Sequence, residues 1–348
     1  MKPIIAVPAI AALVYRAWSR KSLTLLGIFA AVLTAVAHAV HPWSAPLTLL
    51  GVFYLSGTKV TKVKHDIKAR LTLSATGSEG GEGQRTHIQV LANSVVASVL
   101  ILCHTYLLSR DPDQTAATCF SCGRRPADVF VVGIVANYAA VAADTFSSEL
   151  GILSKSKPRL ITSPTLRVVP PGTNGGVTAT GLLAGVLGAF LISATSAILL
   201  PFCAQEGLVT RAQWVVAFTA CGTLGSVLDS VLGGLLQASV VDKRSGKVIE
   251  GAGGEKVLVH PTTNPGGSTG LGTAGSSGVR TDSTRSRKSE KQSGPAAEED
   301  LGHESRRVES GLDLLDNNAV NVLMALTMSV GAMAVASWMW GISVYGLI

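Results

Sequence analysis

The amino-acid sequence predicts an all-α protein, a polytopic transmembrane helix bundle of about eight spans. Of its 348 residues, 47% are hydrophobic and only 15% are charged, which is too apolar for a soluble domain of this length. The hydrophobic residues also stand in blocks, and several blocks approach the ~20 residues that a helix needs to cross a bilayer. The basic residues gather between these blocks. We therefore expect lipid to surround most of the chain.

Eight apolar blocks mark the expected spans. The first resembles a signal peptide, but no small-residue cleavage site stands before Arg16, so we expect it to be retained. The third is the weakest, because Pro46 interrupts it and a run of ~12 residues rises only ~18 Å as a helix. If it is re-entrant, seven spans remain. In chain order, the expected spans are 3–18, 23–40, 43–57, 88–108, 128–143, 177–201, 213–237 and 319–348.

Lysine and arginine in short loops set the orientation of membrane helices, because positive charge stays on the cytosolic side. The loop after the second span has no basic residue, and the loop after the sixth has only Arg211. Arg110, Arg124 and Arg125 after the fourth span are a mild conflict. The odd-numbered connections are therefore expected to be cytosolic, with both termini on the opposite side. Their basic residues are Arg16, Arg20 and Lys21, then Lys59, Lys62, Lys64, Lys68, Arg70 and Arg85, then Lys155, Lys157, Arg159 and Arg167, and finally Lys243, Arg244 and Lys247.

The formal net charge of +7 would indicate nucleic-acid binding only if the basic residues formed a soluble patch. Because they lie in short loops beside apolar blocks, membrane topology explains them, and no nucleic-acid partner is expected. The sequence names no protein partner. Membrane lipid is the expected surrounding, and the default compartment is the endoplasmic reticulum or another endomembrane.

The five cysteines have no framework spacing. Cys103, Cys203 and Cys221 lie in or beside apolar blocks and are expected to be packing residues. Cys119-x-x-Cys122 has no second pair, so a small loop disulfide, or no bond at all, is favoured over a zinc site.

Three regions follow from the pattern. Residues 1–244 hold the first seven helices and their basic loops, and residues 316–348 hold the last helix. Residues 245–315 form a mostly disordered cytosolic insert, because the Gly/Ser/Thr-rich stretch from 261 to 309 cannot bury enough apolar surface to offset its ordering entropy.

Ionisable and amide side chains inside the expected spans gather in the cytosolic half of the membrane. Such groups are costly in lipid and usually face a cavity or a partner. Asp144 and Asp229 are the two acids, and we expect them to be functional. Asn93, Asn318 and Asn321 support them. Interhelical hydrogen bonds are an equally good explanation of Asn93.

A glycine-rich loop precedes the sixth span within the sequence RVVPPGTNGGVTATG. Glycines allow backbone amides to approach an anion, and the start of a helix carries partial positive charge. The loop is thus a candidate phosphate cradle, with Arg167 as an added cation, although an ordinary turn would look similar. Its residues are Gly172, Thr173, Asn174, Gly175 and Gly176.

Two acids beside a phosphate site suggest Mg²⁺, which proteins hold through one or two carboxylates, substrate phosphates and waters. Asp144 and Asp229 are the candidate metal ligands and catalytic residues. Glu149 is a third candidate, but on one continuous helix it would point about 140° away from Asp144, so both can act only if the helix ends between them. Lys62 and Lys64 would supply mobile cations for phosphates.

Five motifs occur in a characteristic order: GTKVTKVK (57–64), DTFSSELG (144–151), PPGTNGGV (170–177), LDSVLGGLLQ (228–237) and DNNAVNVLMAL (316–326). Together they resemble the transmembrane protein 19 family, which includes a chloroplast phytyl-phosphate kinase. The resemblance covers the chain from about Arg20 to its end, apart from the inserts. It implies a kinase that converts an isoprenoid monophosphate to the diphosphate with a nucleoside triphosphate, CTP being the expected donor.

The positions carried over from that resemblance are Asp144, Ser148, Glu149, Gly172, Thr173, Asn174, Gly175 and Asp229. The chain departs from the plant-type pattern twice. It has Asn174 where an acid follows the Gly-Thr of the loop, and Leu228-Asp229-Ser230 where the pattern has Gly-Glu-Ser. The second change keeps the carboxylate and shortens its reach by one methylene.

Two other functions fit the composition. A secondary transporter would also place acids in its helices, but it should show a repeated motif in both halves, and none is found. A non-catalytic membrane adaptor would use the insert to bind partners and would tolerate replacement of the two acids. The sequence shows no Ser-His-Asp or Cys-His arrangement for nucleophilic catalysis.

Overall fold

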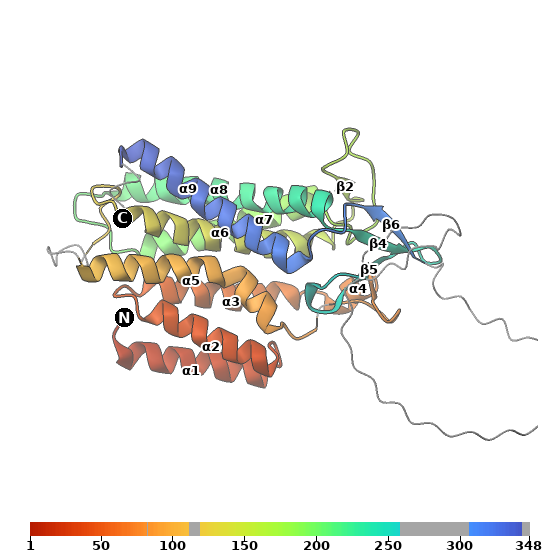
Figure 1. Ribbon diagram of the computed structural model, residues 1–348, viewed down its shortest axis with the longest axis horizontal. Coiled ribbons are helices and arrows are strands. Elements are labelled where there is room, and N and C mark those ends of the chain that lie inside the picture. Colours follow the sequence, from red (N-terminus) through yellow and green to blue (C-terminus); the bar gives the residue numbers. More distant parts are fainter. Residues whose placement is uncertain (82, 111–118, 258–305, 343–348) are drawn as a thin grey trace, which may run out of the picture.

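The computed structural model describes residues 1–81, 83–110, 119–257 and 306–342. In this part of the chain, eight long helices and the short α4 form an elongated bundle (Figure 1). The helices are α1 (Pro3–Ser19), α2 (Leu25–Ala39), α3 (Ala45–Thr61), α4 (His65–Ala69), α5 (His87–Arg110), α6 (Asp128–Gly151), α7 (Ala179–Leu199), α8 (Leu208–Leu236) and α9 (Asn317–Trp340).

Each expected span contains one of the long helices. Among the described residues, α5 to α9 are the five helices long and apolar enough to cross a membrane, and α1 and α2 are shorter apolar helices. α3 has 17 residues and corresponds to the span that the sequence marked as weakest. A mostly helical, polytopic membrane protein is thus confirmed, whereas length and composition support five full spans and not eight.

α6 lies at the centre of the bundle, against α3, α5, α7, α8 and α9. Small residues let helix backbones approach closely in a membrane. A Cβ on Gly222 of α8 would lie 2.6 Å from the Ala139 carbonyl oxygen, and one on Gly225 would lie 2.5 Å from the Ala140 Cβ. α8 therefore packs directly on α6, one turn before the acids of both helices.

α6 continues to Gly151, beyond the expected end at 143. The apolar run stops there, but the polar residues that follow keep helical geometry up to the end of the bundle. Asp144 and Glu149 consequently share one continuous helix and point in different directions. The helix end that would let both act at one site is absent, so Glu149 does not face the same site as Asp144.

Two small sheets cover one end of the bundle (Figure 1). The larger has strand order β1-β5-β4-β6, with β1 parallel to β5 and the other neighbours antiparallel. The smaller pairs β2 with β3 in antiparallel fashion. The strands are β1 (Leu73–Ser74), β2 (Arg159–Leu160), β3 (Gly176–Val177), β4 (Ser239–Asp242), β5 (Val248–Glu250) and β6 (Arg306–Ser310).

These strands correct the expectation of an all-α protein. With two to five residues each, they are too short to show the alternation by which strands are recognised. β5 and β6 lie within the expected insert at 245–315, so its two flanks are ordered parts of the sheet. Residues 258–305 lie outside the described residues, and disorder there stays a prediction.

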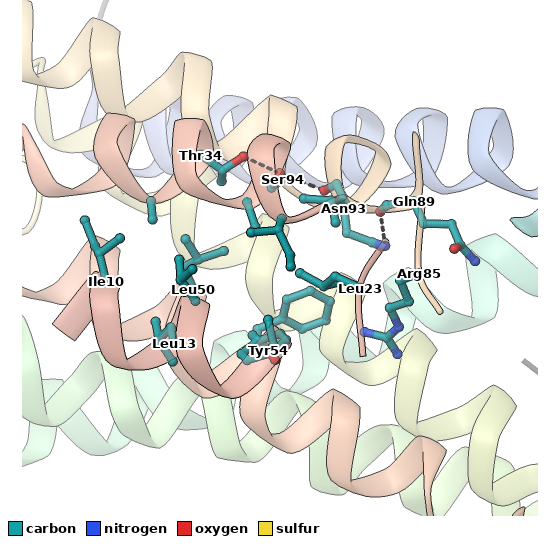
Figure 2. Close-up of a pocket in the computed structure, with 17 residues that line it drawn as sticks. Ile10, Leu13, Leu23, Thr34, Leu50, Tyr54, Arg85, Gln89, Asn93 and Ser94 are labelled. Atoms are coloured by element: carbon teal, nitrogen blue, oxygen red, sulfur yellow. Dashed lines mark hydrogen bonds between the residues drawn. The ribbon is translucent and has the colours of Figure 1, made fainter. Parts of the chain in front are cut away.

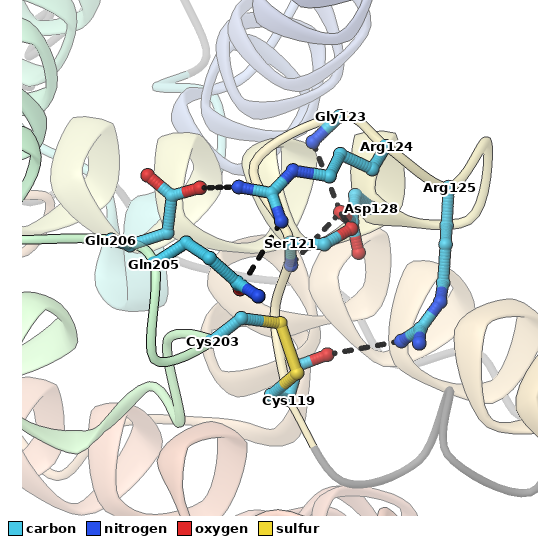
Figure 3. Close-up of a disulfide and its surroundings, with 9 residues drawn as sticks. All are labelled: Cys119, Ser121, Gly123, Arg124, Arg125, Asp128, Cys203, Gln205 and Glu206. Atoms are coloured by element: carbon cyan, nitrogen blue, oxygen red, sulfur yellow. Dashed lines mark hydrogen bonds and ion pairs between the residues drawn. A yellow bond between two sulfur atoms is a disulfide. The ribbon is translucent and has the colours of Figure 1, made fainter.

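The opposite end of the bundle is tied by a disulfide between Cys119 and Cys203, 84 residues apart (Figure 3). The Phe120 amide donates to the Pro201 carbonyl (2.7 Å), and the Cys203 amide donates to the Phe120 carbonyl (2.9 Å). Cys203 is therefore a disulfide partner, which corrects its expected packing role. Its partner comes from another loop, so local spacing could not show the pair.

This disulfide agrees with the orientation expected from the basic loops. Disulfides persist in oxidising compartments and are rare in the cytosol, so we continue to expect the sheet end on the cytosolic side and the disulfide end on the other. Arg124, one of the residues in conflict, donates to Glu206 (2.6 Å) and Gln205 (3.2 Å), and Arg125 donates to the Cys119 carbonyl (3.3 Å). Both arginines have structural partners at the disulfide end.

Candidate functional site

Asp144 of α6 and Asp229 of α8 lie side by side, with their carboxyl groups in hydrogen-bonding contact. Each is seven residues from the end of its helix, so both lie about 10 Å inside the sheet end of the bundle at 1.5 Å per residue. The close approach of α8 to α6 brings them together. The sequence predicted these two acids as one site, and the structure joins them.

Asp229 Oδ2 is buried without a hydrogen-bond partner among the described residues. Two adjacent, half-buried carboxyl groups repel each other when both are charged, so a shared proton or a bound cation would stabilise the pair. Mg²⁺ takes oxygen ligands and is often held by only one or two protein carboxylates, so this pair fits it. Over the described ranges no cluster of three or more His, Cys, Asp or Glu residues could hold a metal by itself.

α9 contributes further oxygen atoms to the same half of the bundle. Asn318 and Asn321 are buried, and the described structure gives no partner to either side-chain oxygen. The Asn318 side-chain nitrogen donates to the Gly253 carbonyl (3.0 Å), which ties the start of α9 to the segment after β5. Asn318 is thus held at the sheet end of the bundle, and Asn321 lies about one turn further along α9.

The side chain of Asn93 bonds within its own helix. Its side-chain nitrogen donates to the Gln89 carbonyl (2.9 Å), and its backbone carbonyl accepts a hydrogen bond from the Asn137 side chain of α6 (3.3 Å). The contact between α5 and α6 is thus made by the Asn93 backbone, and the two explanations that the sequence left open for the side chain both stay predictions.

Glu149 is not part of the acid pair. It forms an ion pair with Lys68 of α4, and both side chains are largely buried. Ser148 is exposed, and its hydroxyl donates to the Asp144 backbone carbonyl (3.0 Å). Ser148 therefore contacts the main chain of an acid that the site uses, while its own side chain lies on the surface.

The glycine loop packs on the helix that carries Asp229. Gly172 and Gly175 have positive φ angles of 87° and 76°, which favour glycine. A Cβ on Gly175 would lie 2.7 Å from Gly234 Cα and 2.8 Å from the carbonyl oxygen of Ser230. Only glycine permits this approach, so one function of the loop is to lie against α8 beside the acid pair.

The amides of the loop are largely engaged within the protein. The Thr173 amide donates to the Pro170 carbonyl (3.3 Å), the Gly176 amide to the Thr173 carbonyl (2.9 Å) and the Asn174 amide to the Ser239 hydroxyl (2.8 Å). β3 also separates the loop from the start of α7. In this arrangement the loop is a packed turn, and an anion would have to displace these hydrogen bonds to use it as a cradle.

The expected cations differ in their availability. Lys62 and Lys64 are exposed in the turn between α3 and α4. Arg167 instead binds Glu309 of β6: its Nη1 lies 2.6 Å from the carboxylate, and its Nη2 donates to the backbone carbonyl (2.7 Å). Lys62 and Lys64 thus agree with a mobile role, whereas Arg167 holds the loop region to the sheet.

The sequence matches a known family of membrane proteins. Residues 8–329 match the family described as integral membrane protein DUF92. The chain belongs to the DUF92 family. The match covers every candidate site residue, and it confirms a multi-pass integral membrane protein without assigning a compartment or an activity.

Two relatives illustrate how the DUF92 chain compares with curated proteins. Over 165 residues it is 36% identical to Protein PGR of Arabidopsis thaliana, covering 45% of this chain and 54% of the relative. Over 107 residues it is 45% identical to an uncharacterized membrane protein of Methanocaldococcus jannaschii, covering 31% and 40%. The chain spans about half the length of these relatives, or less. No solved structure matches it.

Arg85 is a site residue that sequence reasoning missed in this DUF92 chain. It appeared only as one of many basic loop residues. In the structure its Nη2 donates to the Thr61 hydroxyl (3.0 Å). A Cβ on Gly57 would lie 3.5 Å from Arg85 Nη1 and 3.6 Å from Thr145 Cγ2, and Thr145 directly follows Asp144. The guanidinium thus lies against α3 on the side that faces Thr145 of α6, a relationship that no local sequence signal reveals.

Proposed function

We propose that this DUF92 chain is a membrane-embedded, kinase-like enzyme that phosphorylates an isoprenoid monophosphate to the diphosphate. The donor is a nucleoside triphosphate, CTP being the expected one, and Mg²⁺ is the expected metal. The observation that carries the proposal is the Asp144–Asp229 pair with its unpartnered oxygen, about 10 Å inside the cytosolic end of the bundle. The ordered motifs that resemble the transmembrane protein 19 family supply the reaction class.

The reaction requires little covalent chemistry from the protein. An oxygen of the lipid phosphate attacks the terminal phosphorus of the nucleotide, the bond to the bridging oxygen breaks, and the nucleoside diphosphate leaves. Catalysis then consists mainly of positioning and charge neutralisation. Mg²⁺, held by Asp144 and Asp229, would neutralise the phosphate oxygens. Asn321 can orient a phosphate or a water from α9, and Lys62 and Lys64 can approach the nucleotide from the cytosol.

The depth of the acid pair suits a lipid substrate. An isoprenoid phosphate lies with its chain in the bilayer and its headgroup at the boundary, where the pair, Arg85 and the lysines gather. The nucleotide must come from the cytosol, which the sheet end faces. We assign the enzyme to the endoplasmic reticulum or another endomembrane, because the disulfide at the other end needs an oxidising lumen.

The test uses the full chain, purified in detergent with added lipid. Phytyl phosphate or geranylgeranyl phosphate is supplied with Mg²⁺ and labelled CTP, GTP or ATP, and labelled prenyl diphosphate is measured. Asp144→Asn and Asp229→Asn should each abolish product. Asp66→Asn, at a side chain that is 98% exposed on α4, is the matched control and should remain active. Folded protein that gives no product with any pair of substrates would reject the kinase and favour transport or an adaptor role.

A further inference from the structure

An apolar groove runs between α1, α2, α3 and α5, and neither acid of the pair lines it (Figure 2). Its cavity volume is about 80 Å³, which leaves room for part of a hydrocarbon chain. Most of its lining is aliphatic, from Ile10 and Leu13 of α1 to Leu50 of α3. The groove therefore has the lining that a hydrocarbon chain needs.

One end of the groove carries a fixed cation. Figure 2 shows Ile10 at one end and Arg85 at the other, with Leu13, Leu50 and Tyr54 between them. Along α1 the lining extends from residue 10 to residue 17, which is about 10 Å of helix. Because Arg85 precedes α5 at the sheet end, the charged end of the groove opens toward the cytosolic boundary.

The backbone of Arg85 is held by the turn between α1 and α2. Its amide donates to the Ser22 carbonyl (3.1 Å), and its carbonyl accepts from the Thr24 amide (3.0 Å). A Cβ on Gly27 would lie 2.7 Å from that carbonyl oxygen, so Gly27 permits the contact. The arginine is thus built into the end of the groove and is not a loose surface side chain.

The same guanidinium contacts α3 where that helix faces α6. It reaches Thr61 and Gly57 on α3, and Gly57 also faces Thr145 of α6. A phosphate on Arg85 would therefore lie at the end of the groove that borders α3. A single groove with one cation at its end matches a lipid that has one chain and one phosphate.

We infer that the groove binds the chain of a single-chain lipid monophosphate, with the phosphate on Arg85. That the lipid is the isoprenoid substrate rests on the proposed kinase function. The groove holds the part of the chain next to the headgroup, and Arg85 is the headgroup-binding residue.

The experiment measures binding without nucleotide or Mg²⁺. The full chain in phosphatidylcholine vesicles is exposed to a geranylgeranyl monophosphate that carries a photoreactive diazirine near the phosphate end of its chain, and the labelled peptides are identified. We expect labelling on α1, α2, α3 and α5. Leu50→Trp and Leu13→Trp, which fill the groove, should reduce labelling at least tenfold. Leu33→Trp on α2, at a side chain that is 55% exposed and outside the groove, should not.

The headgroup is tested with a second variant and a second probe. Arg85→Gln should weaken binding of the monophosphate at least tenfold, Arg85→Lys should weaken it less, and neither should alter binding of the corresponding alcohol. Labelling that maps elsewhere, or that persists in both Trp variants, would overturn the inference. Full competition by excess phosphatidylcholine would also overturn it, because the groove would then hold ordinary bilayer lipid.

The two proposals fail in different ways. Diphosphate formation that Leu50→Trp and Leu13→Trp leave unchanged would keep the kinase and reject the groove. Specific labelling of the groove in a protein that makes no diphosphate would keep the groove and reject the kinase.

Discussion

Lys68 of α4 and Glu149 of α6 form an ion pair in which the side chains are 8% and 11% exposed. The Lys68 ammonium also donates to the Val60 carbonyl (3.2 Å) and the Thr61 carbonyl (2.6 Å). An ammonium has three donors, and all three are used. The pair therefore fastens α4 and the end of α3 onto the central helix at the cytosolic end.

Removing one member of this pair should destabilise the protein, because the other charge stays buried without its partner. We expect Glu149→Gln or Lys68→Met to cost about 3–5 kcal/mol, measured as the loss of thermal stability in detergent. The double variant Lys68→Met/Glu149→Met should recover most of that loss and keep activity per folded molecule. A double variant that is folded but inactive would instead restore the catalytic role first predicted for Glu149.

Asp144 and Asp229 should behave in the opposite way. Replacing either by Asn removes a carboxyl group from a crowded pair, so thermal stability without Mg²⁺ should stay the same or rise. Mg²⁺ should stabilise the unaltered protein, by about 2.7 kcal/mol at a hundred times its dissociation constant, and should not stabilise the two variants. Melting curves with Mg²⁺ or with a chelator measure this. Variants that are less stable without Mg²⁺ would show that the acids are structural.

Variants of Arg167 and Glu309 can distinguish a structural role of Arg167 from a role in phosphate binding. Arg167 is 42% exposed at the side chain, so its ion pair should contribute at most about 1 kcal/mol. We expect Arg167→Ala to lower stability slightly, and Glu309→Ala to lower it more because Glu309 also pairs with Arg307 (3.0 Å); neither should change the nucleotide KM. If only Arg167→Ala raises that KM tenfold or more, the arginine exchanges its carboxylate for phosphate during turnover.

The disulfide predicts both stability and topology. Reduction of Cys119–Cys203 should cost about 2–4 kcal/mol, and in sealed microsomes its thiols should react with a membrane-impermeant maleimide only after reduction and permeabilisation. Burial raises the pKa of the nearby Cys122 thiol to about 12, so Cys122 stays protonated near pH 8 and reacts slowly in the folded protein. If the reagent labels Cys119 and Cys203 from the cytosolic side, the orientation of the bundle is the opposite of the one expected.

Local sequence patterns predicted the helices well because a membrane helix is encoded by its own composition. Every expected span contains a helix, and even the doubtful third block forms α3. The helix ends were less certain: α6 continues through Asp144 and Glu149 to Gly151, since hydropathy marks where lipid ends and not where the backbone stops being helical. The short strands could not be predicted, because they are too short to show a repeating pattern.

The residues of the candidate site also differ in whether the sequence could reveal them. Asp144 and Asp229 stand out because acids in apolar blocks are rare. Lys68 and Arg85 did not stand out, since a basic residue in a membrane loop is ordinary. The engagement of Arg167 with Glu309, 142 residues away, likewise had no local signal.

The sequence by itself determined that this is a helical membrane protein with two acids in the same half of the bilayer, because composition and spacing act within one helix. The tertiary structure decided which of these groups meet. Gly222 and Gly225 set how closely α8 approaches α6, and that approach brings Asp229 to Asp144. Contacts of this kind depend on the packing of residues far apart in the chain, which no single segment encodes.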